Sequence, residues 1–178
     1  MFCRGTALLA VRSVLSKKPA ALSTAVIRTI PIRTLTFKPL YTAEATANGG
    51  RNGTVKTSDG LLDLQLALPT GLGGPGGAKS NPEQLFAAGY SACFLGALHL
   101  VAGKAKITLP ASTTVNGHVH IGRHDGSLLL EVELKVYAPD VDKTKLMELV
   151  ESAHKVCPYS LATRGNVKVH LQSYSHKM

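Results

Sequence analysis

The sequence has few aromatic residues and few cysteines, and each shortage excludes a class of protein. It contains no Trp, and aromatic residues make up 5 % of its 178 residues, which argues against a surface that stacks bases or sugars. Three cysteines are too few for a disulfide-stapled secreted scaffold or for a zinc site of four thiolates. Because 44 % of the residues are hydrophobic, the chain can build the core of one domain, and general disorder is excluded.

Acidic residues are missing from the first part of the chain. Residues 1–40 contain seven basic residues and no Asp or Glu, whereas residues 41–178 contain 13 basic and 11 acidic residues, a balance of +2. A basic nucleic-acid-binding domain is therefore not expected. Residues 1–37 are rich in Arg, Ser, Thr, Ala and Leu, a composition typical of a mitochondrial transit peptide. We expect this tail to address the protein to the mitochondrial matrix and residues 38–178 to form the folded domain; a disordered basic arm is the alternative.

The folded part alternates between strand patterns and helix patterns. Apolar residues with a period of two predict strands at 62–68, 115–122, 127–137 and 167–171, and His124-Asp125-Gly126 is the hairpin turn between the second and third of these. Turn sequences at 48–53 and 58–60 indicate that residues 41–68 form a three-stranded antiparallel unit.

Two main helices are predicted. Asn81, Pro82 and Gln84 form an N-terminal capping signature for a helix that reaches about Gly103. This helix carries no formal charge after its first turn, and its several small and polar residues favour a place in a core over a membrane span. A second helix is expected from Asp140 or Asp142 to about Val156, with a short helix restarting at Pro158. This order predicts an α+β fold, and dimerisation to bury the rest of the apolar helix.

Cysteine, histidine and glycine residues are the candidates for chemistry. Cys93 lies in the middle of the long predicted helix and Cys157 lies beside a helix start, where backbone N–H groups favour a thiolate. Spacing alone leaves open whether they are inert core residues or a redox pair. His118, His120 and His170 are candidate metal ligands, but we interpret them as part of a solvated strand face. Gly71, Gly73 and Gly76 match G-x-G-x-x-G weakly, and we interpret them as a flexible loop that binds no phosphate.

Longer motifs carry a resemblance to a known family. They are Asn48-Gly-Gly-Arg-Asn-Gly53, Ser58-Asp-Gly60, the glycines from Gly73 to Gly77, Asn81-Pro-Glu-Gln-Leu-Phe-Ala-Ala-Gly-Tyr-Ser-Ala-Cys-Phe94, and Val156-Cys-Pro-Tyr-Ser160. Together they resemble the organic hydroperoxide resistance (Ohr) branch of the OsmC/Ohr family over about residues 38–178; the N-terminal tail departs from the bacterial pattern. The resemblance implies an intertwined α+β homodimer, with antiparallel strands, a long central apolar helix and two active sites at the interface.

The resemblance also implies a thiol-dependent peroxidase that reduces organic and fatty-acid hydroperoxides. Cys93 matches the peroxidatic cysteine and Cys157 the resolving cysteine, with a disulfide formed between them during turnover. Arg51 matches the active-site arginine and Glu83 its carboxylate partner. The implied reductant is dihydrolipoamide or a lipoylated protein, and no metal, haem, flavin or other cofactor is implied.

The chemistry of peroxide reduction explains why these residue types are needed. A peroxide is attacked by a thiolate, and burial in an apolar helix raises the pKa of a thiol, so a nearby cation such as Arg51 is needed. Glu83 and Cys93 are ten residues apart, which is about 15 Å along one helix. We therefore expect the Glu83 and Cys93 of one site to come from different subunits. Apolar helix residues would form the substrate channel: Phe86, Phe94, Leu95 and Leu98.

Two other functions remain open from the sequence. One is a non-enzymatic redox sensor, in which the same cysteines oxidise once and change the shape of the protein. The other is an OsmC-like disulfide reductase with another substrate. Steady-state turnover with a dithiol distinguishes the sensor from both enzymes.

Overall fold

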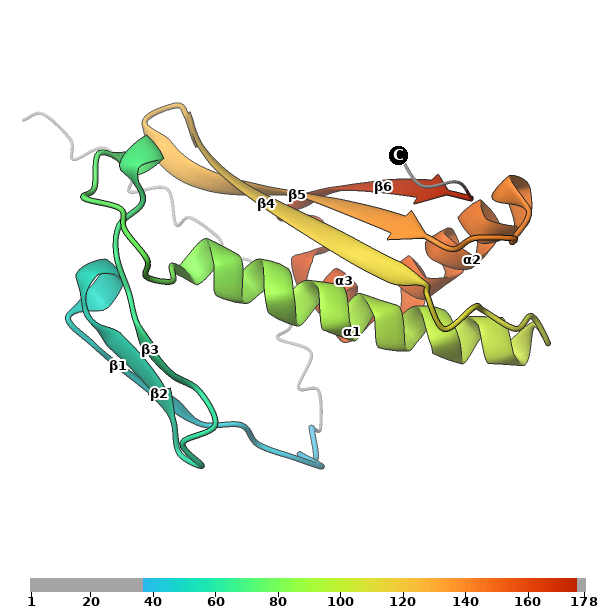
Figure 1. Ribbon diagram of the computed structural model, residues 1–178, viewed down its shortest axis with the longest axis horizontal. Helices are drawn as coiled ribbons and strands as arrows, with labels where there is room; N and C mark the ends of the chain where they lie inside the picture. The colour runs from blue at the N-terminus through green and yellow to red at the C-terminus, as the bar shows by residue number, and fades with distance from the viewer. Residues whose placement is uncertain (1–36, 176–178) are drawn as a thin grey trace, which may run out of the picture. The chain divides into compact units, whose positions relative to one another are not determined.

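The structure is a computed structural model that describes residues 37–175. The chain divides into two units, Met1–Leu40 and Tyr41–Met178. The predicted targeting tail at residues 1–37 lies outside the described residues except for its last position, and so does Cys3. Figure 1 shows that the second unit contains two separate sheets and one long helix, which runs beneath the larger sheet.

Helix α1 (Pro82–Lys104) begins at the predicted capping signature. The Asn81 side chain accepts a hydrogen bond from the Gln84 backbone N–H at 2.9 Å, and the Gln84 side chain accepts one from the Asn81 N–H at 3.1 Å, so both ends of a capping box are present. The helix is long and apolar enough to cross a membrane. However, Tyr90, Phe94 and Leu98 have no exposed surface within the chain, as expected for the core helix of a folded domain.

The larger sheet contains β4 (Thr114–His124), β5 (Ser127–Tyr137) and β6 (Lys168–Tyr174) in the order β4-β5-β6. Strands β4 and β5 form the predicted antiparallel hairpin, closed by Asp125 and Gly126 with φ of 47° and 81°, the left-handed conformations of a type I′ turn. Strands β5 and β6 are parallel, which differs from the expectation of antiparallel strands. The reason is that two helices lie between them in sequence and carry the chain back across the sheet.

Helices α2 (Lys143–Val156) and α3 (Pro158–Thr163) make this crossover. Asp142 caps α2 by accepting a hydrogen bond from the Lys145 backbone N–H at 3.0 Å. Pro158 has no N–H to continue α2, but it suits the first position of α3.

The hydrophobic core lies between the larger sheet and the helices. Its fully buried residues from β5 and α2 are Val132, Leu134, Val136, Leu146, Val150 and Ala153. On the neighbouring strand, Gly117 lets α1 approach closely, because a Cβ atom there would lie 2.4 Å from the Ser91 hydroxyl oxygen.

The smaller sheet contains β1 (Ala45–Asn48), β2 (Thr54–Thr57) and β3 (Asp63–Gln65), all antiparallel as predicted. Strand β3 ends earlier than expected, and Leu66 instead forms an isolated parallel bridge with Ser80. None of the residues in these three strands is buried. A three-stranded sheet needs a packed apolar face to be stable. The exposure of this sheet therefore indicates that another surface packs against it.

Candidate active site

The two cysteines of the described domain lie side by side. Cys93 is in the middle of α1 and Cys157 lies between α2 and α3, yet their sulfur atoms are 3.5 Å apart. Both are free thiols; Cys157 has no exposed surface, whereas Cys93 is half-buried. The fold thus brings together the two residues that the sequence predicted as a redox pair, and only a small movement separates them from a disulfide.

Burial disfavours the thiolate form of Cys93 in the single chain. Burial raises the pKa of Cys93, and so does the neighbouring Cys157, while a hydrogen bond from the Tyr159 backbone lowers it in part. A thiolate is the reactive form of cysteine. The Cys93 site as built from one chain therefore needs a further positive charge before its sulfur is an effective nucleophile at neutral pH.

Hydrogen bonds between hydroxyl groups connect α3 to α1 near Cys93 and Cys157. The Tyr90 hydroxyl lies 2.9 Å from the Ser160 hydroxyl oxygen and 3.3 Å from that of Thr163. Tyr90 and Ser160 have no exposed surface. The sequence analysis missed this network, because only folding brings Tyr90 within reach of residues 70 and more positions away.

Three aromatic rings extend the site along α1. The Phe86 ring centre lies 5.8 Å from that of Tyr90 and 6.1 Å from that of Tyr159, and the two tyrosine rings are 5.6 Å apart. Tyr159 is 39 % exposed, so this cluster reaches the surface of the chain. The rings form an apolar wall next to the thiol pair.

Arg51 and Glu83 form the second predicted pair. Arg51 lies in a short 3₁₀ turn between β1 and β2, and Glu83 lies in the first turn of α1. Two hydrogen bonds of 2.8 and 2.7 Å join the guanidinium to the two carboxylate oxygens, the bidentate geometry that orients an arginine. The Arg51 hydrogen bonds hold the pKa of Glu83 below its usual value, and Glu83 raises the pKa of Arg51.

The two pairs are separate within one chain. Glu83 and Cys93 lie on the same straight helix, about 15 Å apart along its axis. Among the described residues, burial, Cys157 and Tyr159 determine the pKa of Cys93, and Arg51 does not contribute. Within one chain the four predicted residues therefore form two separate pairs, Cys93–Cys157 and Arg51–Glu83.

The predicted channel residues fall into two groups. Phe94 and Leu98 have no exposed surface and belong to the core between α1 and the larger sheet, so we remove them from the channel. Phe86 and Leu95 are half-buried and remain candidates. Phe86 lines a cavity of about 360 Å³ together with the Arg51–Glu83 pair and three residues that the sequence analysis missed, Ile121, Leu128 and Leu130.

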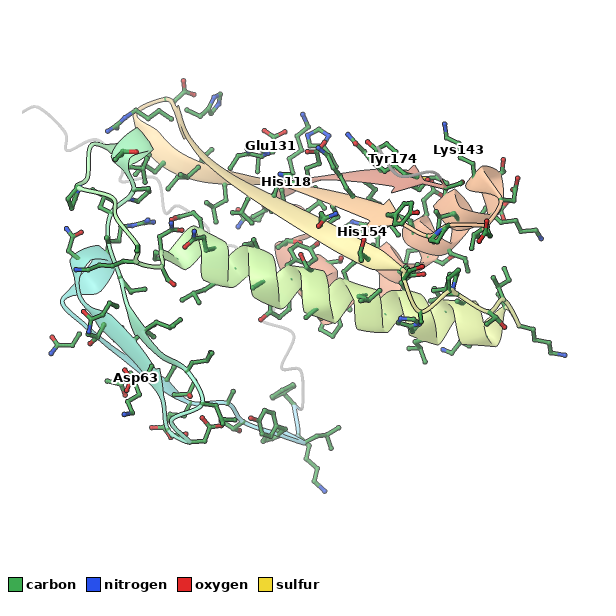
Figure 2. The ribbon with its side chains drawn as sticks, in the orientation of Figure 1. Asp63, His118, Glu131, Lys143, His154 and Tyr174 are labelled. Atoms are coloured by element: carbon green, nitrogen blue, oxygen red, sulfur yellow. The ribbon has the colours of Figure 1, made fainter. Side chains whose placement is uncertain are left out.

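The histidines lie on the outer face of the larger sheet. His118, His120 and His170 are exposed, and His170 forms a hydrogen bond with Glu131; Figure 2 shows His118 and Glu131 on the side of the sheet away from α1. Within residues 37–175 no group of three or more His, Cys, Asp or Glu side chains is placed to hold a metal ion. The exposure of His118, His120 and His170 agrees with the predicted solvated strand face.

Comparisons with known proteins agree with the fold and the motifs. A family model described as OsmC-like protein matches residues 74–172. An organic hydroperoxide resistance protein from Xanthomonas axonopodis pv. citri (strain 306) is 52 % identical over 134 residues, which cover 75 % of this chain and 94 % of the relative. The crystal structure of an organic hydroperoxide resistance protein OsmC from Legionella pneumophila matches with a TM-score of 0.71 and 47 % identity, over 76 % of this chain and 98 % of that one.

The structure of OhrB from Bacillus subtilis is similar to the same extent. It matches with a TM-score of 0.70 and 44 % identity, over 76 % of this chain and all (100 %) of the bacterial chain. The matched region includes the long helix and both cysteines of the described domain. The chain therefore belongs to the family of OsmC-like proteins, on its organic hydroperoxide resistance (Ohr) branch.

Proposed function

We propose that this protein is a thiol-dependent peroxidase that reduces organic hydroperoxides to alcohols. The observation that carries the proposal is the pair of free thiols, Cys93 and Cys157, with sulfur atoms 3.5 Å apart. The names of the relatives in Xanthomonas and Bacillus point to a role in organic hydroperoxide resistance, and a pair of adjacent thiols has the chemistry for that role.

The reaction consists of two steps in the protein. The Cys93 thiolate attacks one oxygen of the peroxide, the O–O bond breaks, and the alkoxide leaves as an alcohol after taking a proton; Cys93 becomes a sulfenic acid. The Cys157 thiol then attacks the Cys93 sulfur, a disulfide forms, and water leaves with the former sulfenic oxygen. An external dithiol reduces the disulfide by exchange and is itself oxidised to a disulfide.

A homodimer would complete the site. In an antiparallel pair of α1 helices related by a two-fold axis, Glu83 of one chain comes level with Cys93 of the other when the helices cross midway, near Ala88. Ala88, Ala92 and Gly96 are exposed in the single chain, and such small residues allow close approach of two helices. The uncovered smaller sheet supports the same assembly, because a second chain would supply the missing packing partner.

Arg51 has two roles in the assembled site. Its permanent charge lowers the pKa of the partner subunit's Cys93, opposing the effect of burial. Its planar guanidinium, oriented by Glu83, also binds the peroxide oxygens while negative charge moves onto the leaving oxygen.

The apolar surroundings favour alkyl hydroperoxides over hydrogen peroxide. The cavity beside Arg51 and Glu83 is lined by Pro82, Phe86, Ile121, Leu128 and Leu130. Transfer of an alkyl chain from water into such a cavity gains about 0.8 kcal/mol for each buried CH₂ group. Hydrogen peroxide has no apolar part and gains nothing from this wall, so fatty-acid and other organic hydroperoxides are the proposed substrates.

The proposed reductant is dihydrolipoamide, free or carried by a lipoylated protein. The two thiols of dihydrolipoamide are close enough to form a ring disulfide after the first exchange, which drives reduction of a protein disulfide to completion. The basic, acid-free N-terminus supports a place in the mitochondrial matrix, a compartment that contains lipoylated enzymes. We propose no metal or organic cofactor for the reaction.

Steady-state turnover tests the proposal. The full-length protein is mixed with cumene hydroperoxide and dihydrolipoamide, and hydroperoxide loss is followed beside Cys93→Ser and Cys157→Ser variants. We expect many turnovers in the wild type and none in Cys93→Ser. In Cys157→Ser we expect a single oxidation of Cys93, because no disulfide forms for the dithiol to reduce. Consumption that stops after one equivalent would identify a redox sensor instead, and equal efficiency with hydrogen peroxide would contradict the apolar substrate class.

A further inference from the structure

We propose that Tyr90 is a positioning residue for the second step, in which Cys157 captures the oxidised Cys93. This inference rests on the proposed peroxidase function. It concerns a residue without a thiol or a charge, which acts by holding a short helix and not by touching the substrate.

The geometry places Tyr90 between the two cysteine-bearing segments. Tyr90 lies on α1 one turn before Cys93, and its hydroxyl contacts Ser160 at 2.9 Å and Thr163 at 3.3 Å in α3. Cys157 immediately precedes α3. The Tyr90 hydroxyl therefore connects the helix that carries Cys93 with the helix whose start carries Cys157.

Helix α3 depends on such a connection. It has six residues, which is too short for a helix to be stable through its own hydrogen bonds. The side chain of its N-cap residue, Cys157, makes no hydrogen bond that caps the helix. Tertiary contacts must therefore hold α3, and the hydrogen bond between Tyr90 and Ser160, two residues without exposed surface, is such a contact between α3 and the helix of Cys93.

The two hydroxyl partners differ in what they lose without Tyr90. Thr163 also hydrogen-bonds the backbone carbonyls of Tyr159 and Ser160, at 2.9 and 3.3 Å. Within the described residues the Ser160 side chain has Tyr90 as its hydrogen-bond partner. Removal of the Tyr90 hydroxyl leaves the buried Ser160 hydroxyl unsatisfied, and a buried polar group without a partner favours local rearrangement toward water.

Movement of α3 would affect the second chemical step more than the first. The first step needs the Cys93 sulfur and the hydroperoxide, and α3 acts on that sulfur through the Tyr159 backbone, which lowers the pKa of Cys93 in part. The second step needs the Cys157 sulfur within reach of the Cys93 sulfenic acid. When Cys157 is displaced, a second hydroperoxide molecule oxidises the sulfenic acid to a sulfinic acid and is reduced to an alcohol, so the sulfur gains the oxygen and the enzyme is lost.

The test compares Tyr90→Phe and Ser160→Ala with the wild type in the full chain. A matched control is Tyr174→Phe, because the Tyr174 hydroxyl also hydrogen-bonds a side chain, that of Gln172 in the larger sheet. Each protein receives a small excess of cumene hydroperoxide without dithiol. Mass spectrometry then measures the fractions of Cys93 present as the disulfide and as sulfinic acid, and stopped-flow measurements follow loss of the first thiol.

We expect the ratio of sulfinic acid to disulfide to rise about fivefold in Tyr90→Phe and in Ser160→Ala, with the rate of the first oxidation within twofold of the wild type. The double variant should show no more than Tyr90→Phe alone, because Tyr90→Phe already removes the hydrogen bond to Ser160 together with the one to Thr163. The control should keep the wild-type ratio.

An unchanged ratio in both Tyr90→Phe and Ser160→Ala would overturn the inference while leaving the peroxidase proposal intact. An equal slowing of both chemical steps would also overturn it, since a general structural role would then explain the effect. If Tyr90→Phe does not fold, Ser160→Ala alone decides. Failure of the wild type to form the disulfide at all would instead overturn the proposed function.

Discussion

Two inactive variants of this chain should restore activity when they are combined in one dimer. Arg51→Gln removes the cation that activates the sulfur, and Cys93→Ser removes the sulfur itself. Because Glu83 and Cys93 are about 15 Å apart along α1, the Arg51–Glu83 pair of one chain is expected to serve the Cys93 of the other. In a mixed dimer, one site then has both an intact Arg51 and an intact Cys93, and the other site has neither.

The expected recovery follows from counting sites. Each heterodimer has one intact site out of two, so the purified heterodimer should have about half of the wild-type activity, and a random mixture of equal amounts, in which about half of the dimers are heterodimers, about a quarter. If Arg51 instead served the cysteine of its own chain, every site in every dimer would lack one group. No activity would then be recovered, so the heterodimer assay distinguishes a site shared between subunits from a site within one chain.

The assay needs purified heterodimers and two negative controls. The variants are co-expressed with different tags, heterodimers are purified through both tags, and turnover of cumene hydroperoxide with dihydrolipoamide is measured. The control heterodimers pair an Arg51→Gln chain with a Glu83→Gln chain, and a Cys93→Ser chain with a Cys157→Ser chain. Neither should regain activity, because in each of them both sites are damaged in the same half. Absence of recovery in the test heterodimer, with dimer formation confirmed by both tags, would refute the two-subunit site.

Three further predictions follow from the charges and the core. Arg51 holds the pKa of Glu83 below its usual value. The contribution of this pair to the free energy of unfolding should therefore be complete above the normal pKa of a carboxyl group and be lost as the pH falls through the lowered pKa of Glu83. Urea unfolding of the wild type and of Glu83→Gln at a series of pH values measures this contribution. In a variant that retains only Cys93, Arg51→Gln should move the midpoint of iodoacetamide alkylation to higher pH, and an unmoved midpoint would show that Arg51 does not act on this sulfur. Leu134 has no exposed surface, so Leu134→Ala should lower the free energy of unfolding by about 2–5 kcal/mol in the same urea assay.

Local signals explain why much of the fold was predictable. The Asn81–Gln84 capping box fixes where α1 begins, and Asp125-Gly126 fixes the hairpin, because both depend on neighbouring residues alone. The direction of β6 was not predictable in this way. Apolar alternation shows that Val169 and Leu171 lie on one face, but it does not show whether the strand runs parallel or antiparallel to its neighbour.

The site was predictable in its residue types and less so in its arrangement. The motifs around Cys93 and Cys157 indicated a redox pair, and the fold places the two sulfur atoms 3.5 Å apart. The assignment of Phe94 and Leu98 to the channel failed because α1 is apolar on nearly every face, so composition does not tell which side faces the core. The Tyr90 network was missed because it depends on contacts between distant segments.

The central claim is that one molecule of hydroperoxide oxidises Cys93 and that Cys157 captures it. The most direct measurement adds one equivalent of cumene hydroperoxide to the reduced full-length protein and maps the disulfides by mass spectrometry under acidic digestion. The account predicts loss of two thiols per chain, one equivalent of alcohol, and a Cys93–Cys157 disulfide within a single chain. Retention of both thiols while the hydroperoxide persists, or a disulfide that joins other cysteines, would contradict it.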